Sequence, residues 1–209
     1  MAGLLSLAAL ADAQTPADSF QVRYAANLPL SDSFINLTNA GTSSTTSGLP
    51  GGGFQNGNLC VNVYAYSPDE QLISCCSCSV TPNGLASLSV VNDLTSNTLT
   101  PIRPSSVVVK LLASDDAAGC NAATVRRIDG PNTLKPGLVA WMTTMHALPV
   151  TVGTPAGTLG ITETGFSRAM LSDAELVRMT QLCGFIRANG SGYGICKSCR
   201  FGALGGATK

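Results

Sequence analysis

Charge is what this sequence has least of. Asp, Glu, Lys and Arg make up 11% of its 209 residues, against about 25% in an average soluble domain. The 12 basic and 12 acidic residues cancel, so no basic surplus exists to neutralise nucleic-acid phosphates. A weakly charged surface repels copies of itself poorly. The chain is therefore either built to self-associate or kept in solution by its many hydroxyl and amide groups.

Catalytic residue patterns are also missing. The one histidine, His146, has no convincing nucleophile near it in the sequence, so a Ser-His-Asp triad is not indicated. The glycine-rich segment 190–194 lacks the Lys and Ser/Thr of a phosphate-binding loop, and no G-x-S-x-G elbow occurs. Paired acidic residues fall in expected turns, where carboxylates are usually solvated. We therefore predict neither an enzyme nor a cofactor.

No apolar run here reaches the roughly 20 residues that a membrane-spanning helix needs. The N-terminal MAGLLSLAALADAQTP has a short apolar run that ends in Ala11-Asp12-Ala13, a small-x-small pattern typical of signal-peptide cleavage. It lacks the Lys or Arg that usually precedes such a run. Residues 1–13 are thus either a secretory signal that is removed or a hydrophobic segment retained to pack against neighbouring subunits. In neither case do we expect a membrane span in the mature chain.

Strand patterns dominate the remainder. In the segment 14–39, Phe20, Val22 and Tyr24 alternate with polar residues, which predicts a half-buried strand. Residues 40–58 form a Gly/Ser/Thr-rich linker or loop that spans roughly 25 Å if flexible, so the N-terminal strands can join their own sheet or a neighbour's. Further strands separated by Pro, Gly and Asn turns predict an antiparallel β-sandwich domain over 59–209; they are expected at 59–66, 71–80, 85–91, 107–113, 137–148 and 157–164.

One C-terminal helix is expected at about 172–189, in LSDAELVRMTQLCGFIRANG. Ser172 and Glu175 match the S-x-x-E capping box, in which the hydroxyl and the carboxylate bind otherwise unpaired backbone N–H groups. Leu171 and Leu176 are spaced for a hydrophobic staple. The helical spacing of the apolar residues places Cys183 on the face toward the protein body.

The cysteines indicate a disulfide framework, because an even set in a chain of secretory character is typical of an oxidising compartment. Three of them cluster in LISCCSCSV. The neighbours Cys75 and Cys76 are poor partners for each other, since Cα atoms joined by a peptide bond lie about 3.8 Å apart. On a strand they point to opposite faces and can pin separate layers. The eight predicted disulfide cysteines are Cys60, Cys75, Cys76, Cys78, Cys120, Cys183, Cys196 and Cys199.

Zinc or redox chemistry is the alternative for these cysteines. Cys75 and Cys78 form one C-x-x-C, and Cys196 and Cys199 form another, and two such pairs can bind zinc tetrahedrally. The pairs lie much farther apart than in zinc ribbons, and a thioredoxin-like centre would need a βαβ context that is missing. We adopt disulfides and predict no metal site.

One resemblance adds to this interpretation. The block NLCVNVYAYSPDEQLISCCSCSVTPNGLASLSV and the tail GSGYGICKSCRFGALGG are similar to a group of secreted bacterial proteins with no assigned function. The similarity extends from about residue 58 to the C-terminus and rests on the cysteine motifs. It implies an extracellular location and no activity or catalytic residue.

Two functions fit these observations. The first is a secreted structural subunit that binds copies of itself in an extracellular filament or surface layer, with its N-terminal strand added to a neighbour's sheet in a pilus-like manner. The second is a monomeric secreted binding module that recognises a carbohydrate or surface ligand through its loops. We favour the first.

Overall fold

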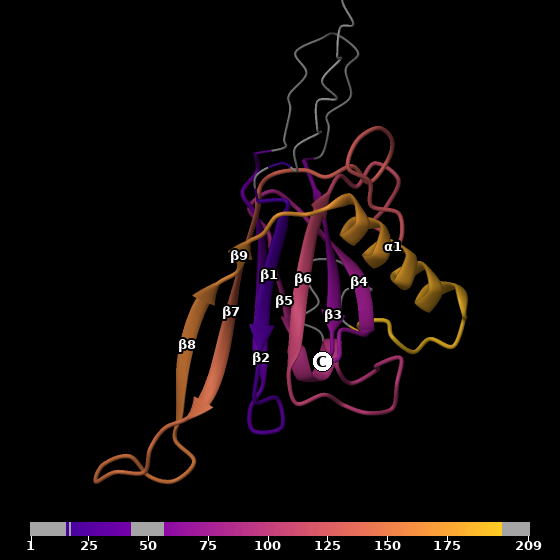
Figure 1. Ribbon diagram of the computed structural model, residues 1–209. Coiled ribbons are helices and arrows are strands. Elements are labelled where there is room, and N and C mark those ends of the chain that lie inside the picture. Colours follow the sequence, from indigo (N-terminus) through magenta and orange to yellow (C-terminus); the bar gives the residue numbers. More distant parts are fainter. Residues whose placement is uncertain (1–15, 17, 43–56, 198–209) are drawn as a thin grey trace, which may run out of the picture.

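The computed structural model describes residues 16, 18–42 and 57–197. Two antiparallel sheets pack face to face, and a single long helix lies against the outside of one of them (Figure 1). The predicted disulfide-stapled antiparallel β-sandwich with one C-terminal helix is therefore confirmed. The expected signal at 1–13, most of the linker and Cys199 lie outside the described residues.

The larger sheet has five strands in the order β4-β3-β6-β1-β9. Strands β3 and β6 are central and are covered on both faces, which explains why VVVKLLA reads as a nearly continuous apolar run. The short β9 pairs with β1 through Val22 and Ser167. The bounds are Phe20–Ala25 for β1, Leu59–Tyr66 for β3, Leu72–Val80 for β4, Val107–Ser114 for β6 and Ser167–Arg168 for β9.

The smaller sheet has four strands in the order β5-β2-β7-β8. Its outer strand β8 and the end of β7 project away from the body of the sandwich as an arm (Figure 1). The bounds are Ser33–Asn39 for β2, Leu85–Ser89 for β5, Leu138–Ala147 for β7 and Leu159–Gly165 for β8.

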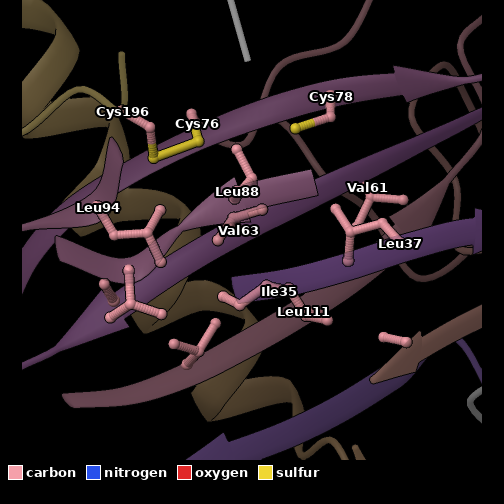
Figure 2. Packing of buried hydrophobic residues seen from close by; sticks show 14 of the residues in the cluster. Ile35, Leu37, Val61, Val63, Cys76, Cys78, Leu88, Leu94, Leu111 and Cys196 are labelled. Carbon is pink, nitrogen blue, oxygen red and sulfur yellow. A yellow bond between two sulfur atoms is a disulfide. The ribbon is translucent and has the colours of Figure 1, made fainter. Parts of the chain in front are cut away.

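Strand alternation divides the buried side chains into two clusters. Val61, Val63 and other inward residues of β3 lie in the core between the sheets (Figure 2). Tyr64 and Tyr66, on the other face of β3, lie in a second cluster beneath helix α1, Asp173–Ala188. The five-stranded sheet is therefore a middle layer between the four-stranded sheet and the helix.

Both N-terminal strands belong to their own chain's sheets. Strand β1 pairs with β6 on one side and β9 on the other. Strand β2 lies between β5 and β7 and contributes Ile35 and Leu37 to the core. The segment before the linker is thus an interior part of the sandwich.

The strand expected at 85–91 ends early. β5 stops at Ser89, and Val90–Leu94 form a short π-helix, η1. The carboxylate of Asp32 accepts hydrogen bonds from the Val91 N–H at 2.9 Å and from the Ser89 hydroxyl. This acceptor comes from the distant β1–β2 connection and satisfies an N–H group at the helix start.

Candidate functional site

Three disulfides lie within the described residues. Cys60 on β3 bonds Cys120 in the connection that follows β6. Cys75 on β4 bonds Cys183 on α1, and Cys76 bonds Cys196 in the segment after the helix. The Cα atoms in each pair are 5.2, 5.9 and 5.4 Å apart, as ordinary disulfide geometry requires.

The adjacent cysteines of β4 serve opposite faces of the same sheet. Cys75 lies in the cluster beneath the helix, and Cys76 with Cys196 lies in the core between the sheets (Figure 2). Cys78 points to the same core and is also disulfide-bonded. The cysteine cluster of β4 is therefore a covalent junction between layers.

The zinc alternative is not compatible with these bonds, since Cys75 and Cys196 are oxidised with other partners. Among the described residues, no group of three or more His, Cys, Asp or Glu side chains is placed to hold a metal ion. His146 is exposed at the end of β7, where its Nε2 lies 3.1 Å from the Thr162 hydroxyl.

The N-terminal end of α1 lies beside a pocket. The Ser172 hydroxyl accepts a hydrogen bond from the Glu175 N–H at 3.1 Å. The Glu175 carboxylate is directed to Lys110 of β6, with which it forms a salt bridge. The Lys110 ammonium also lies 4.7 Å from the centre of the Tyr66 ring, a cation–π distance.

This pocket has a volume of about 530 Å³ and lies between α1, β6 and the β3–β4 turn; its lining includes Tyr66, Lys110, Glu175 and Arg178. Burial raises the pKa of Tyr66 to about 12, with Arg178 lowering it and Glu175 raising it in smaller measure. In the pocket, Lys110 and Glu175 form a salt bridge with each other, and Arg178 donates to the Glu70 carbonyl at 3.3 Å. The two basic residues of the lining, Lys110 and Arg178, are matched by two acidic ones, Glu70 and Glu175, which leaves little net charge to attract a ligand.

The projecting arm is the feature that sequence patterns did not single out. Most of β8 is exposed, and exposed apolar side chains collect on the arm and at its tip, among them Val150 at 70% and Ile161 at 68% exposure. The pattern of β8 predicted a strand but not which side of it would be left uncovered, because that depends on strand order.

Backbone groups on the outer side of β8 are unpaired within the described residues. The Leu148 N–H donates to the Thr158 carbonyl, and the Phe166 N–H donates to the Ala140 carbonyl. Because hydrogen-bonded pairs alternate in an antiparallel ladder, Gly160, Thr162 and Thr164 bond to β7. The N–H and C=O groups of the residues between them, Leu159, Ile161, Glu163 and Gly165, point away from β7.

The other sheet edges in the described part of the chain are covered or short. At the β4 edge, the Cys75 N–H donates to the Gly194 carbonyl at 2.9 Å. At the β5 edge, the Ser89 N–H donates to the Asp93 carboxylate at 2.7 Å. β9 has two residues. Proteins protect strand edges from pairing with other chains in these ways. Of the four edge strands, β8 is the least protected.

Comparison of this chain with family models, curated proteins and solved structures found no match. Within the described residues, no helix has the length and apolar character needed to cross a membrane. The three disulfides are consistent with an extracellular protein, because such bonds persist in oxidising compartments.

Proposed function

We propose that this chain is a secreted structural subunit that binds copies of itself, and that the outer edge of β8 is the contact. The observation that carries the proposal is the projecting β7–β8 arm, whose outer strand exposes a row of backbone donors and acceptors beside apolar side chains. Such an edge is a template for another strand.

The pairing register follows from which residues face outward. If two β8 strands pair antiparallel about Thr162, Ile161 of each copy lies opposite Glu163 of the other. Leu159 then lies opposite Gly165. All four of these residues have outward backbone groups, so they can exchange ladder hydrogen bonds. A register centred on Glu163 would place two carboxylates opposite each other, which is unfavourable.

This contact replaces the N-terminal strand as the favoured route to association. β1 and β2 already occupy interior positions in their own sheets, and giving them to a neighbour would open both sheets. The β8 contact is two-fold and joins copies in pairs. Extension into a filament or surface layer then needs a second, different contact between pairs.

The low charge of the chain supports self-association, because pairs or larger assemblies face little electrostatic repulsion. Secretion, a bacterial source and an extracellular or cell-surface location belong to the same proposal; the disulfides and the resemblance of the cysteine motifs support them.

Ile161→Pro tests the contact. Proline removes one outward N–H without removing a hydrogen bond to β7, and edge strands tolerate it at such positions. We expect the parent protein to sediment as pairs or larger assemblies and Ile161→Pro as a monomer with an unchanged near-UV circular dichroism spectrum. Ile161→Thr, which keeps the N–H, is the matched control and should still associate.

Sedimentation velocity over a wide concentration range decides the matter. A parent protein that stays monomeric throughout would contradict the proposal. So would Ile161→Pro assembling as well as the parent, because the β8 backbone would then not be the contact.

A further inference from the structure

The outer face of the four-stranded sheet carries the chain's one tryptophan. Leu138, Ala140 and Met142 of β7 point into the core, so Trp141 between them points outward and is half-buried. Asn36 of β2 and Gly165 of β8 lie directly opposite Trp141 on either side. The indole therefore lies in a row that crosses three strands.

A line of hydrogen bonds crosses the same face beside the tryptophan. The Ser87 hydroxyl donates to the Asn36 side-chain oxygen at 2.7 Å, and the Asn36 amide donates to the Thr143 hydroxyl at 3.0 Å. The Thr143 hydroxyl donates in turn to the Glu163 carboxylate at 3.1 Å. All three bonds run in one direction, from β5 to β8, which holds these side chains in place before any ligand arrives.

Two members of this line, Glu163 and Asn36, can form further hydrogen bonds. Glu163 is exposed, and the one bond given above uses a single site of a carboxylate that can accept about four. The Asn36 amide has a second N–H beyond the one given to Thr143. The face thus offers an acceptor and a donor next to an aromatic ring.

Space for a ligand exists beside the ring. A side chain added at Gly165 would meet no atom within 4 Å, and the backbone of Gly165 is not in the left-handed region. The open position lies on the outer face, since directly opposed residues share a face. Trp141, Glu163 and Gly165 therefore border open space on the outer face of the sheet.

We propose that this face binds a neutral glycan. A pyranose ring has an apolar C–H face that packs on indole and a rim of hydroxyls that each donate and accept, which matches the ring, the carboxylate and the amide described above. The site side chains Ser87, Asn36, Thr143 and Glu163 include no cation and one anion, so acidic polysaccharides are disfavoured.

This binding function goes beyond self-association and uses different groups. The β8 contact uses outward backbone N–H and C=O groups, whereas the glycan site uses side chains on the sheet face. Pairing of two β8 strands would extend the sheet, and in the register given above Leu159 of the second copy would lie opposite Gly165 at the border of this face. Failure of either proposal can therefore be told apart from failure of the other.

Trp141 supplies its own reporter, because it is the only tryptophan in the chain. We expect soluble cello-, xylo- or manno-oligosaccharides to change its fluorescence in a saturable way, and polygalacturonate to give no saturable change. Gly165→Val should weaken binding about tenfold or more, because its side chain occupies the open space opposite Trp141. Its fold should persist, since valine suits a strand and no backbone strain is introduced.

Calorimetry extends the test to variants without the reporter. Trp141→Ala should lose measurable binding, while Tyr193→Ala, which removes an exposed aromatic elsewhere, should bind as the parent does. Ile161→Pro should also keep binding. No saturable response to any of the three neutral glycans, parent-like binding by Gly165→Val, or equally tight binding of polygalacturonate would each overturn the proposal.

Discussion

At the scale of single residues, two tyrosines on β3 show how burial changes the ionisation of a side chain. The Tyr64 hydroxyl donates to the Ala122 carbonyl at 2.6 Å and is fully buried, and this burial raises its pKa far above the ordinary value. Tyr66 borders the pocket, and burial raises its pKa to about 12. Both side chains are therefore neutral in the folded protein at pH values where an unfolded tyrosine ionises.

A loss of stability at alkaline pH follows. Above the ordinary tyrosine pKa of about 10, the unfolded chain releases protons that the folded chain keeps, so the free energy of unfolding falls as pH rises. Each retained proton contributes a slope of about 1.4 kcal/mol per pH unit. The part of this loss of stability that comes from Tyr66 is complete once pH passes about 12. Tyr64 continues to lower the free energy of unfolding above that pH.

Denaturant unfolding at a series of pH values above 9 measures this slope. Between pH 10 and 12, Tyr66→Phe should reduce the slope of unfolding free energy against pH by the contribution of about one proton. Tyr24→Phe, at a side chain that is 58% exposed, is the matched control. Equal slopes for the parent and Tyr66→Phe would show that Tyr66 ionises alike in both states.

At the scale of elements, helix α1 depends on the cysteine it carries. Met179, Cys183 and Ile186 form its buried face, and the Cys75–Cys183 bond fixes that face to β4. The bond closes a long loop of the unfolded chain, and such crosslinks typically contribute about 2–4 kcal/mol.

We expect Cys75→Ala combined with Cys183→Ala to loosen α1 before the sheets. Hydrogen exchange should show the helix amides losing protection while the β3 and β6 amides keep theirs, because β3 and β6 lie in the middle layer. The matched double variant at Cys60 and Cys120 removes a bond that does not involve the helix, and it should leave α1 protected. Equal protection of α1 in all three proteins would refute this expectation.

Local patterns were sufficient for much of the fold. Val61, Val63 and Ala65 alternate with Asn62, Tyr64 and Tyr66, and this period alone gives β3 two different faces. The helix boundaries follow from Ser172 and the apolar spacing after it. Both signals involve residues a few positions apart.

Features that depend on strand order could not be predicted in the same way. η1 forms where Asp32 reaches it from another connection, and no local pattern contains that contact. The face proposed to bind a glycan brings together Asn36, Trp141 and Glu163 from three strands that are neighbours only in the folded sheet. The disulfide partners were equally open, because eight cysteines allow 105 pairings.

At the scale of the whole molecule, the complete bond map is testable. We expect no free thiol, the three bonds described above and a fourth between Cys78 and Cys199, since Cys78 is disulfide-bonded and Cys199 is the one cysteine left to the chain. A single peptide bond separates Cys75 from Cys76, so the map should be made by stepwise partial reduction with mass spectrometry and not by digestion alone. Eight free thiols together with bound zinc would contradict this map.

The adjacency of Cys75 and Cys76 has a topological consequence. Their peptide bond, the two disulfides and the chain from Cys183 to Cys196 close a covalent macrocycle. A protease that cuts after Arg187 opens this macrocycle but releases no fragment, because each new end remains attached to β4. The C-terminal part of α1 can thus be nicked during local opening while the mass of the oxidised protein, apart from one added water, stays the same.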